Sequence, residues 1–214
     1  MILEAKAVAP FFKNGYVLAC EETNEGAVID PGDELDQLLE VIQDRRLNIR
    51  HILLTHAHVD HVSGVARARE VLGASIHLHP QELPVYVGAV QQGLLFGLSI
   101  DQPPPVDHYY DESPIAFGHY QVRAHHTPGH TPGGVCLEVG RRGEAGTLLF
   151  PGDTLFSGSI GRTDLPGGDY QTLIRSIADV LLGFPDATVV YPGHGPDTTI
   201  GQERRTNPFL TGRR

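Results

Sequence analysis

Three histidines and one aspartate are crowded into residues 55–61, directly after an apolar run at 52–54. They are His56, His58, Asp60 and His61. Imidazole nitrogens and carboxylate oxygens are ligands that Zn²⁺ and similar ions prefer, and crowding them at a strand end gains little unless a cation binds there. Residues i and i+2 of an extended chain point to the same side, so we expect His56 and His58 to converge on one ion while a bend turns Asp60 and His61 toward another. Taken alone, the segment also fits a polar loop whose histidines cap strand and helix ends.

Three later segments place Pro-Gly directly before a residue of the same chemical types. They are 127–133, 150–154 and 191–195, and they carry His130, Asp153 and His194. Glycine permits the sharp turn that ends a strand, and the rigid proline beside it fixes where the next side chain points. We therefore expect these three side chains to gather with the first cluster at one edge of the sheets.

The seven side chains suffice for a two-metal centre with a shared hydroxide completing both shells. One ion would take His56, His58 and His130, the second would take Asp60, His61 and His194, and Asp153 would bridge them. Asp30 follows another strand that reads as buried, and it either accepts a hydrogen bond from a ligand imidazole or only shapes its turn. The remaining histidines are expected to be structural: His51, His77, His79, His108, His119, His125 and His126.

The elements that position these residues read as mixed α/β layers. An amphipathic helix is predicted over 34–46, and a second helix over 62–72 ends at Gly73. The stretch 91–111, with three consecutive prolines, reads as a surface excursion that overhangs the site. Strict alternation of strands and helices is absent, so sheets joined by hairpins and faced by helices fit better than a doubly wound sheet. Strands are predicted at 15–19, 27–30, 51–55, 75–78, 121–125, 135–139, 147–150 and 188–191, with a helix at 169–182.

Composition narrows the class of protein. The 214 residues are 40% hydrophobic and carry a formal charge of −10, which favours one compact domain and disfavours a nucleic-acid partner. Glu4 and Lys6 interrupt the N-terminal segment where a secretion signal is apolar, and no apolar run is long enough to span a bilayer. We expect a cytoplasmic protein without a membrane partner. Cys20 and Cys136 lie in apolar segments and read as buried, reduced thiols.

These motifs resemble the metallo-β-lactamase superfamily, whose His-x-His-x-Asp-His motif is matched by residues 56–61. Within it, segments 127–131, 152–156 and 161–164 and the tail from 193–196 to 207–210 look like the short bacterial glyoxalase II-like hydrolases. The resemblance implies an αββα four-layer sandwich, formed by one metallo-β-lactamase-type domain over residues 1–214. It also implies a dinuclear site of His56, His58, Asp60, His61, His130, Asp153 and His194.

The resemblance further implies hydroxyacylglutathione hydrolase activity on a small acyl-thiol substrate such as S-lactoylglutathione. Long glyoxalase II enzymes append a helical domain that holds much of the glutathione, whereas this chain stops soon after Phe209, so we expect no such domain and the thiol stays open. Segment 161–164 is also similar to persulfide dioxygenases, which use a single Fe²⁺; that alternative would place it on His56, His130 and Asp153. The segment 192–195 looks like the hydrolase form.

A thioester suits such a site because its leaving thiol, with a pKa of roughly 8.5, departs as thiolate without an acid. Asp60 is a metal ligand and a candidate proton shuttle, but it would serve as an acid only by giving up the metal. The expected cofactor is a pair of divalent ions, Zn²⁺ first, with Fe²⁺ and Mn²⁺ as alternatives. Arg162, Arg204 and Arg205 read as solvated surface residues.

Overall fold

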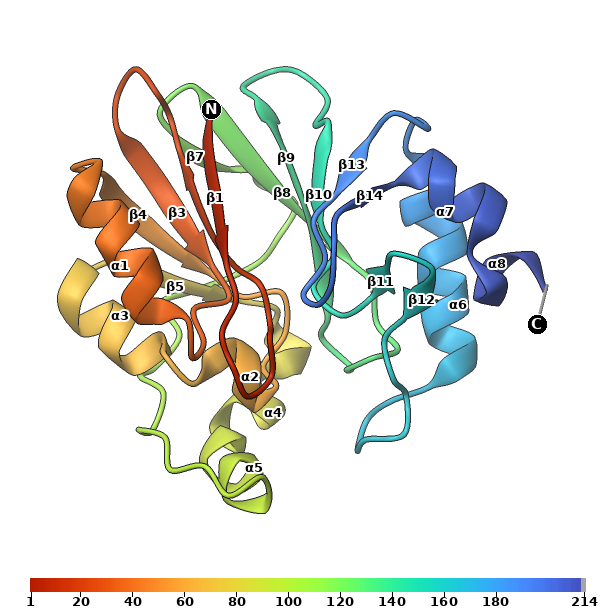
Figure 1. Ribbon diagram of the computed structural model, residues 1–214, viewed down its shortest axis with the longest axis horizontal. Helices are drawn as coiled ribbons and strands as arrows, with labels where there is room; N and C mark the ends of the chain where they lie inside the picture. Colours follow the sequence, from red (N-terminus) through yellow and green to blue (C-terminus); the bar gives the residue numbers. More distant parts are fainter. Residues whose placement is uncertain (213–214) are drawn as a thin grey trace.

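Two six-stranded sheets pack face to face, and helices cover both outer surfaces, in the computed structural model, which describes residues 1–212 (Figure 1). Helices α1 (Leu35–Asp44) and α3 (Val65–Leu72) lie outside the first sheet. Helices α6 (Tyr170–Asp179) and α7 (Ile200–Thr206) lie outside the second. This arrangement confirms the predicted αββα sandwich.

The parallel strands of the first sheet have their carboxyl ends at the edge that carries the histidine-rich segment. Its order is β1-β2-β3-β4-β5-β6; the first three strands are antiparallel, and β3 to β6 are parallel. Parallel strands have their carboxyl ends at the same edge of a sheet, and β4 leads there directly into the histidine-rich segment. The strands are β1 (Ile2–Lys6), β2 (Gly15–Ala19), β3 (Glu25–Ile29), β4 (Asn48–Leu53), β5 (Ser75–Leu78) and β6 (His108–Tyr109).

The second sheet is mostly antiparallel, in the order β14-β13-β10-β9-β8-β7. Among the described strands of this sheet, only β10 and β13 pair in parallel, so the chain leaves both strands at the same edge, toward Asp153 and His194. A small hairpin, β11 (Leu155–Phe156) and β12 (Ser159–Ile160), follows Asp153. The strands of the second sheet are β7 (Ile115–Phe117), β8 (Tyr120–His126), β9 (Val135–Arg141), β10 (Leu148–Phe150), β13 (Val189–Val190) and β14 (Thr198–Thr199).

Alternating side chains build three apolar layers between the four structural layers. In β4, Ile52 packs toward α1 and α3, whereas Leu53 packs between the sheets. In β9, Leu137 faces the space between the sheets and Cys136 faces α6. Because successive residues of a strand point to opposite faces, both sheets are buried on both sides, which fixes the register of each strand.

The structure also corrects several predicted elements. The helix predicted at 62–72 begins only at Val65, as α3, and a separate short helix, α2 (Val59–Val62), precedes it. Between them the chain at Gly64 passes so close to Gly32 that a Cβ would lie 2.6 Å from the Gly32 carbonyl oxygen. The helix predicted at 169–182 ends at Asp179 and continues as a 3₁₀ turn, η2 (Leu181–Gly183). The stretch 91–111 begins inside a helix that the sequence did not predict, α5 (Ala89–Leu95). The other unpredicted helical segments are η1 (Pro80–Glu82), α4 (Leu83–Val87), α7 and α8 (Pro208–Thr211).

The structure also places the two cysteines and limits the length of the helices. Cys20 and Cys136 are buried and form no disulfide, as predicted. Across residues 1–212, no helix has the length and apolar character that crossing a bilayer requires.

Candidate metal centre

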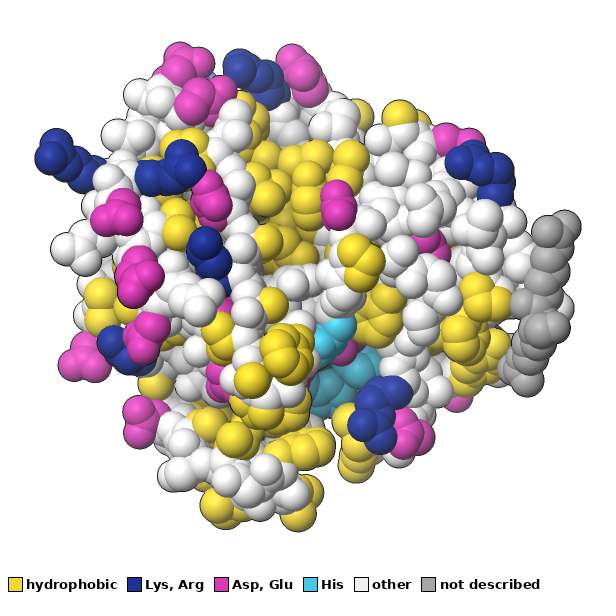
Figure 2. Space-filling model, in the orientation of Figure 1, with side chains coloured by type: hydrophobic (Ala, Val, Ile, Leu, Met, Phe, Trp, Pro, Cys, Tyr) yellow, Lys and Arg dark blue, Asp and Glu magenta, His cyan; other side chains and the backbone are white. Residues whose placement is uncertain are grey.

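The structure brings all seven predicted side chains together at one edge of the two sheets. His56 and His58 follow β4, and Asp60 and His61 lie in α2. The remaining three residues come from the second sheet, after β8, β10 and β13. Figure 2 shows histidine side chains exposed in a hollow near the middle of this face. Potential ligand atoms form three groups, and within each group these atoms lie within 4.8 Å of one another. The groups are His56, His58 and His130; His56, His61 and Asp153; and Asp60, His61 and His194.

The Pro-Gly turns are required by close approach as well as by turn geometry. Gly152 has a φ of +52°, and a Cβ there would lie 2.3 Å from Thr55 Oγ1. A Cβ on Gly193 would lie 2.2 Å from Asp153 Oδ1. A side chain at either position would therefore displace a neighbour of the site, which explains the glycines before Asp153 and His194.

Asp30 fixes two of the ligand histidines by hydrogen bonds. Its carboxylate accepts from the Thr55 amide at 2.7 Å, from Thr55 Oγ1 at 2.6 Å and from His61 Nδ1 at 2.9 Å. Because the Thr55 hydroxyl donates its one proton to Asp30, its oxygen is left to accept from His56 Nδ1, 3.2 Å away. In the neutral form of both imidazoles the proton is therefore on Nδ1, and Nε2 of His56 and Nε2 of His61 are the nitrogens that face the centre.

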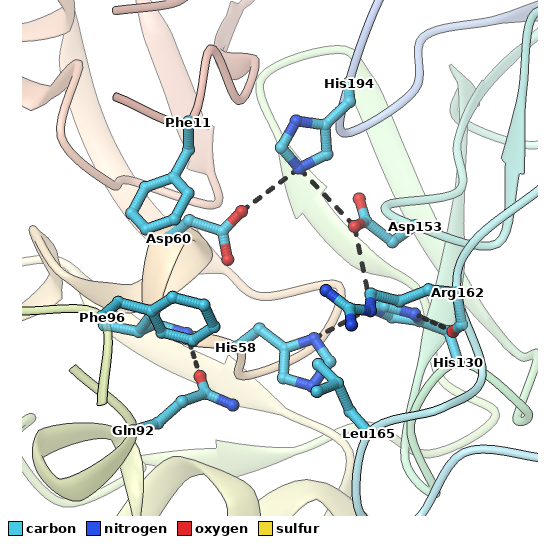
Figure 3. A pocket seen from close by; sticks show the side chains of 11 residues that line it. Phe11, His58, Asp60, Gln92, Phe96, His130, Asp153, Arg162, Leu165 and His194 are labelled. Atoms are coloured by element: carbon cyan, nitrogen blue, oxygen red, sulfur yellow. Dashed lines mark hydrogen bonds and ion pairs between the residues drawn. The ribbon is translucent and has the colours of Figure 1, made fainter. Parts of the chain in front are cut away.

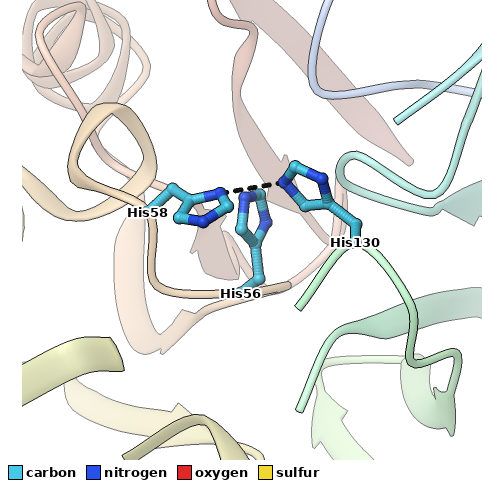
Figure 4. Close-up of side chains that lie close together, drawn as sticks. All are labelled: His56, His58 and His130. Carbon is cyan, nitrogen blue, oxygen red and sulfur yellow. Dashed lines mark hydrogen bonds between the residues drawn. The ribbon is translucent and has the colours of Figure 1, made fainter. Parts of the chain in front are cut away.

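His130 is oriented in the same way by a backbone group. Its Nδ1 donates to the carbonyl oxygen of Arg162 at 2.7 Å, so Nε2 carries the lone pair. That nitrogen lies 2.9 Å from Nδ1 of His58, and the rings of His56, His58 and His130 converge edge to face, with interplanar angles of 82–89° (Figure 4). Three imidazoles thus converge as a first group of nitrogen donors.

The second group is closed by His194. Its Nε2 lies 3.2 Å from Asp60 Oδ2 and 3.6 Å from Asp153 Oδ2. The loop that carries His194 is held by the N-terminal segment: Asn14 Nδ2 donates to the carbonyl oxygens of Pro192 at 3.0 Å and Gly195 at 2.8 Å. The sequence offered no signal for this role of Asn14, because its partners lie about 180 positions away in the chain.

Burial and neighbouring charges shift the protonation states of the residues at the centre in different directions. Burial, followed by the neighbouring imidazoles, lowers the pKa of His56 well below its usual value and that of His58 to about 3. For His61, burial opposes protonation, but the carboxylates of Asp60, Asp153 and Asp30 outweigh it and raise the pKa to about 10. Burial also opposes ionisation of Asp153, yet the facing imidazoles hold its pKa far below the usual value. The carboxylates are therefore anions that attract a cation, bound as a proton or as a metal.

Three atoms at the centre have no hydrogen-bond partner among the described residues. They are Nε2 of His56, Nε2 of His61 and Oδ1 of Asp153, all buried. His61 Nε2 and Asp153 Oδ1 lie 3.3 Å apart without forming a hydrogen bond. Buried polar atoms almost always have a hydrogen-bond partner, so three converging atoms without one fit the coordination of a bound divalent ion.

A buried glutamate joins the two loops of the first group, and its role could not be predicted from the sequence. Glu82, which is fully buried, accepts from the amide of Ala57 at 3.0 Å and from the amide of Gly133 at 2.8 Å. One loop carries His56 and His58, and the other carries His130. A single glutamate before Leu-Pro shows no local pattern, so only the tertiary structure reveals this role.

A cavity of about 200 Å³ opens onto the centre (Figure 3). Phe11 and Phe96 lie on one side of it, and Arg162 and Leu165 on the other. Arg162 is exposed and forms a two-point ion pair with Asp164, with both N–O distances at 2.7 Å. Arg204 and Arg205 contact Asp186 and do not line the cavity.

Comparison with known proteins gives consistent matches over most of the chain. A family profile described as the metallo-beta-lactamase superfamily matches residues 8–194. The hydroxyacylglutathione hydrolase GloC of Haemophilus influenzae is 38% identical over 213 residues, covering 98% of both chains. The probable metallo-hydrolase YqgX of Bacillus subtilis is 36% identical, covering 96% of this chain and 95% of that protein.

A solved structure shares both the fold and a substantial part of the sequence. The crystal structure of TTHA1623 in a di-iron-bound form superposes with a TM-score of 0.84 at 43% identity, covering 97% of this chain and all of that one. The similarity therefore extends over both sheets and every segment that contributes to the centre.

Proposed function

Because this chain belongs to the metallo-β-lactamase superfamily and is a metallo-hydrolase, we propose that it hydrolyses thioesters of the hydroxyacylglutathione type. The observation that carries the proposal is the set of three buried, unpaired atoms on His56, His61 and Asp153, which form one of three groups of potential ligands. The similarity to GloC supports the choice of thioesters, and the similarity to TTHA1623, which was crystallised in a di-iron-bound form, supports two ions.

The proposed first metal site is His56, His58 and His130, and the second is Asp60, His61 and His194, with Asp153 between them. Divalent ions bound there would polarise the substrate carbonyl and make water acidic enough to act as a nucleophile near neutral pH. Zn²⁺ is the first candidate, and Fe²⁺ and Mn²⁺ suit the same donors. The chain itself holds the imidazole tautomers through Asp30, Thr55 and the Arg162 carbonyl group.

The acid–base properties of the cavity favour thioesters over amides. Burial disfavours the ionised form of Asp60, but His61 and His194 reverse the effect and lower its pKa; the pKa of Asp153 is lowered in the same way. Neither carboxyl group holds a proton to give to a departing amine. A thiol leaves as thiolate and needs no such proton, so the carbon–sulfur bond is the one that this site is suited to break.

The rival function is a mononuclear Fe²⁺ persulfide dioxygenase on His56, His130 and Asp153. We favour the hydrolase because that reaction leaves Asp60, His61 and His194 only as hydrogen-bonding partners. They form a further group of potential ligands, in which His194 and Asp60 approach to 3.2 Å. Metal content distinguishes the two functions.

The test combines elemental analysis of the purified protein with release of free thiol from S-lactoylglutathione, followed by a thiol-reactive dye. We expect two divalent ions per chain and thiol release. One iron per chain, with oxygen uptake on a persulfide and no thiol release, would overturn the proposal in favour of the dioxygenase.

A further inference from the structure

Two phenylalanines from distant parts of the chain meet at the mouth of the metal cavity. The rings of Phe11 and Phe96 lie edge to face, with centroids 5.9 Å apart and an interplanar angle of 85°. Both line the same cavity as His58 and Asp60 (Figure 3). This geometry is the favourable one for aromatic pairs, so the two rings form a defined apolar wall beside the centre.

Each ring is tied to one of the ligand loops. Phe11 lies three residues before Asn14, whose amide donates to the Gly193 carbonyl oxygen at 2.7 Å, next to His194. Phe96 follows α5, in which Gln92 Oε1 accepts from the Val59 amide at 2.6 Å, next to His58. The aromatic wall therefore has a fixed place relative to the two groups of ligands, as a substrate subsite requires.

Apolar surface continues from this wall to the outside of the molecule. Phe96 itself is 49% exposed; Phe12, next to Phe11 in the chain, is 64% exposed, and Leu94, two residues before Phe96, is 65% exposed. Figure 2 shows hydrophobic side chains gathered beside the hollow that holds the histidines. Large apolar side chains clustered at the mouth of a cavity mark a binding surface more often than scattered ones do.

The lining of the cavity offers no unpaired Lys or Arg side chain to a carboxylated substrate among the residues that the structure describes. Among its described lining residues, Arg162 is the one Lys or Arg, and Asp164 already neutralises it. The two carboxylates of glutathione therefore find no partner in the enclosed part. The side of the cavity at Arg162 is polar and exposed to solvent, which suits the carrier thiol. The opposite side, formed by Phe11 and Phe96, suits the acyl group of the thioester.

We propose that Phe11 and Phe96 form a subsite for an apolar acyl chain, so that aliphatic and aromatic acyl thioesters are preferred over the polar lactoyl group. The inference rests on the proposed thioesterase function. Water would add to the carbonyl carbon and the carbon–sulfur bond would break, giving a carboxylate, a thiol and one proton. The cavity of about 200 Å³ is small for a ligand pocket, which suits a short acyl chain and the reacting thioester, with the carrier outside.

The experiment varies the acyl chain from acetyl to butanoyl to hexanoyl at a constant N-acetylcysteamine thiol, with lactoyl as the polar comparison. Thiol release gives kcat/KM, and calorimetry gives the Kd of non-hydrolysable ketone analogues in which a methylene replaces sulfur. We expect both kcat/KM and affinity to rise roughly fourfold per added methylene, the ratio that follows from burying one such group. Phe96→Ala should reduce the rise to less than about twofold per methylene, and Phe96→Leu should retain most of it.

Phe209→Ala is the matched control, because Phe209 is 39% exposed on α8 and does not line the cavity. It should keep the wild-type profile. Equal kcat/KM for all acyl groups in the wild type would leave the thioesterase proposal intact and overturn the subsite. Binding of the ketone analogues that depends on chain length, without hydrolysis of the thioesters, would support the subsite and overturn the thioesterase proposal. An unchanged profile in Phe96→Ala, with a shift in sedimentation, would also overturn the subsite and assign the apolar surface to contact between copies.

Discussion

Replacing Asp30 by asparagine should weaken metal binding without removing a ligand. The native carboxylate accepts three hydrogen bonds, from the Thr55 amide, the Thr55 hydroxyl and His61 Nδ1. Asparagine has one oxygen, and its NH₂ group donates where the second carboxylate oxygen accepted. His61 would then accept at Nδ1 and carry its proton on Nε2, the atom that must be bare to bind an ion.

The expected loss in metal affinity is about 10- to 100-fold, or about 1.4–2.8 kcal/mol, as for other groups that orient a ligand imidazole. The size of the side chain hardly changes, so no cavity is created. Competition with a chromophoric chelator measures the affinity, and a thermal melt of the chelator-treated protein measures the fold separately.

The control is Asp33→Asn, the same substitution at an exposed aspartate that accepts from Ser63 Oγ at 2.7 Å. It should leave the affinity unchanged. If Asp30→Asn binds metal as tightly as the wild type, then Asp30 does not set the tautomer of His61. A loss of thermal stability with unchanged affinity would give Asp30 a purely structural role.

Three further predictions rest on the same geometry. His58→Ala should lower kcat/KM at least 100-fold and remove bound metal while circular dichroism stays native, and wild-type rates would contradict its role as a ligand. Glu82→Ala should lower the free energy of unfolding by about 2–5 kcal/mol in urea, because the amides of Ala57 and Gly133 both lose their acceptor, whereas Glu82→Gln keeps one acceptor and should cost less. In chelator-treated protein, protonated His61 should stabilise the fold fully below pH 6.5, and this stabilisation should be lost as the pH rises through about 10; a melting temperature that rises over that range would refute it.

Local patterns explain which parts of the fold the sequence predicted. Strands β2 and β5 were predicted over the residues that form them, because a short apolar run between turn signals identifies a buried strand. Strands β11 and β12, of two residues each, are too short to show any periodicity. Periodicity predicted a helix from residue 62, whereas α3 begins at Val65. The chain just before α3, at Gly64, lies against the distant Gly32, and periodicity cannot reveal such a contact.

For the candidate site, too, local features were predictable from the sequence and distant contacts were not. The metal-ligating residue types were recognisable because their spacing and the Pro-Gly turns are local in the sequence. The contacts that hold them are not: Asn14 reaches the His194 loop, and Glu82 joins loops 76 residues apart, at Ala57 and Gly133. Phe11 and Phe96 lie in irregular segments where an aromatic residue carries no pattern, so their proximity required the fold.

Each of the three His/Asp groups takes ligands from both halves of the chain: residues 56–61 on one side, and His130, Asp153 or His194 on the other. The exposed loop at 111–114 is the connection from the first sheet to the second. An ion bound in any group is therefore a reversible cross-link between the two sheets. Because binding to the folded state alone adds to stability, metal supply becomes part of the folding equilibrium, and starvation for metal would loosen the junction between the sheets as well as stop the chemistry.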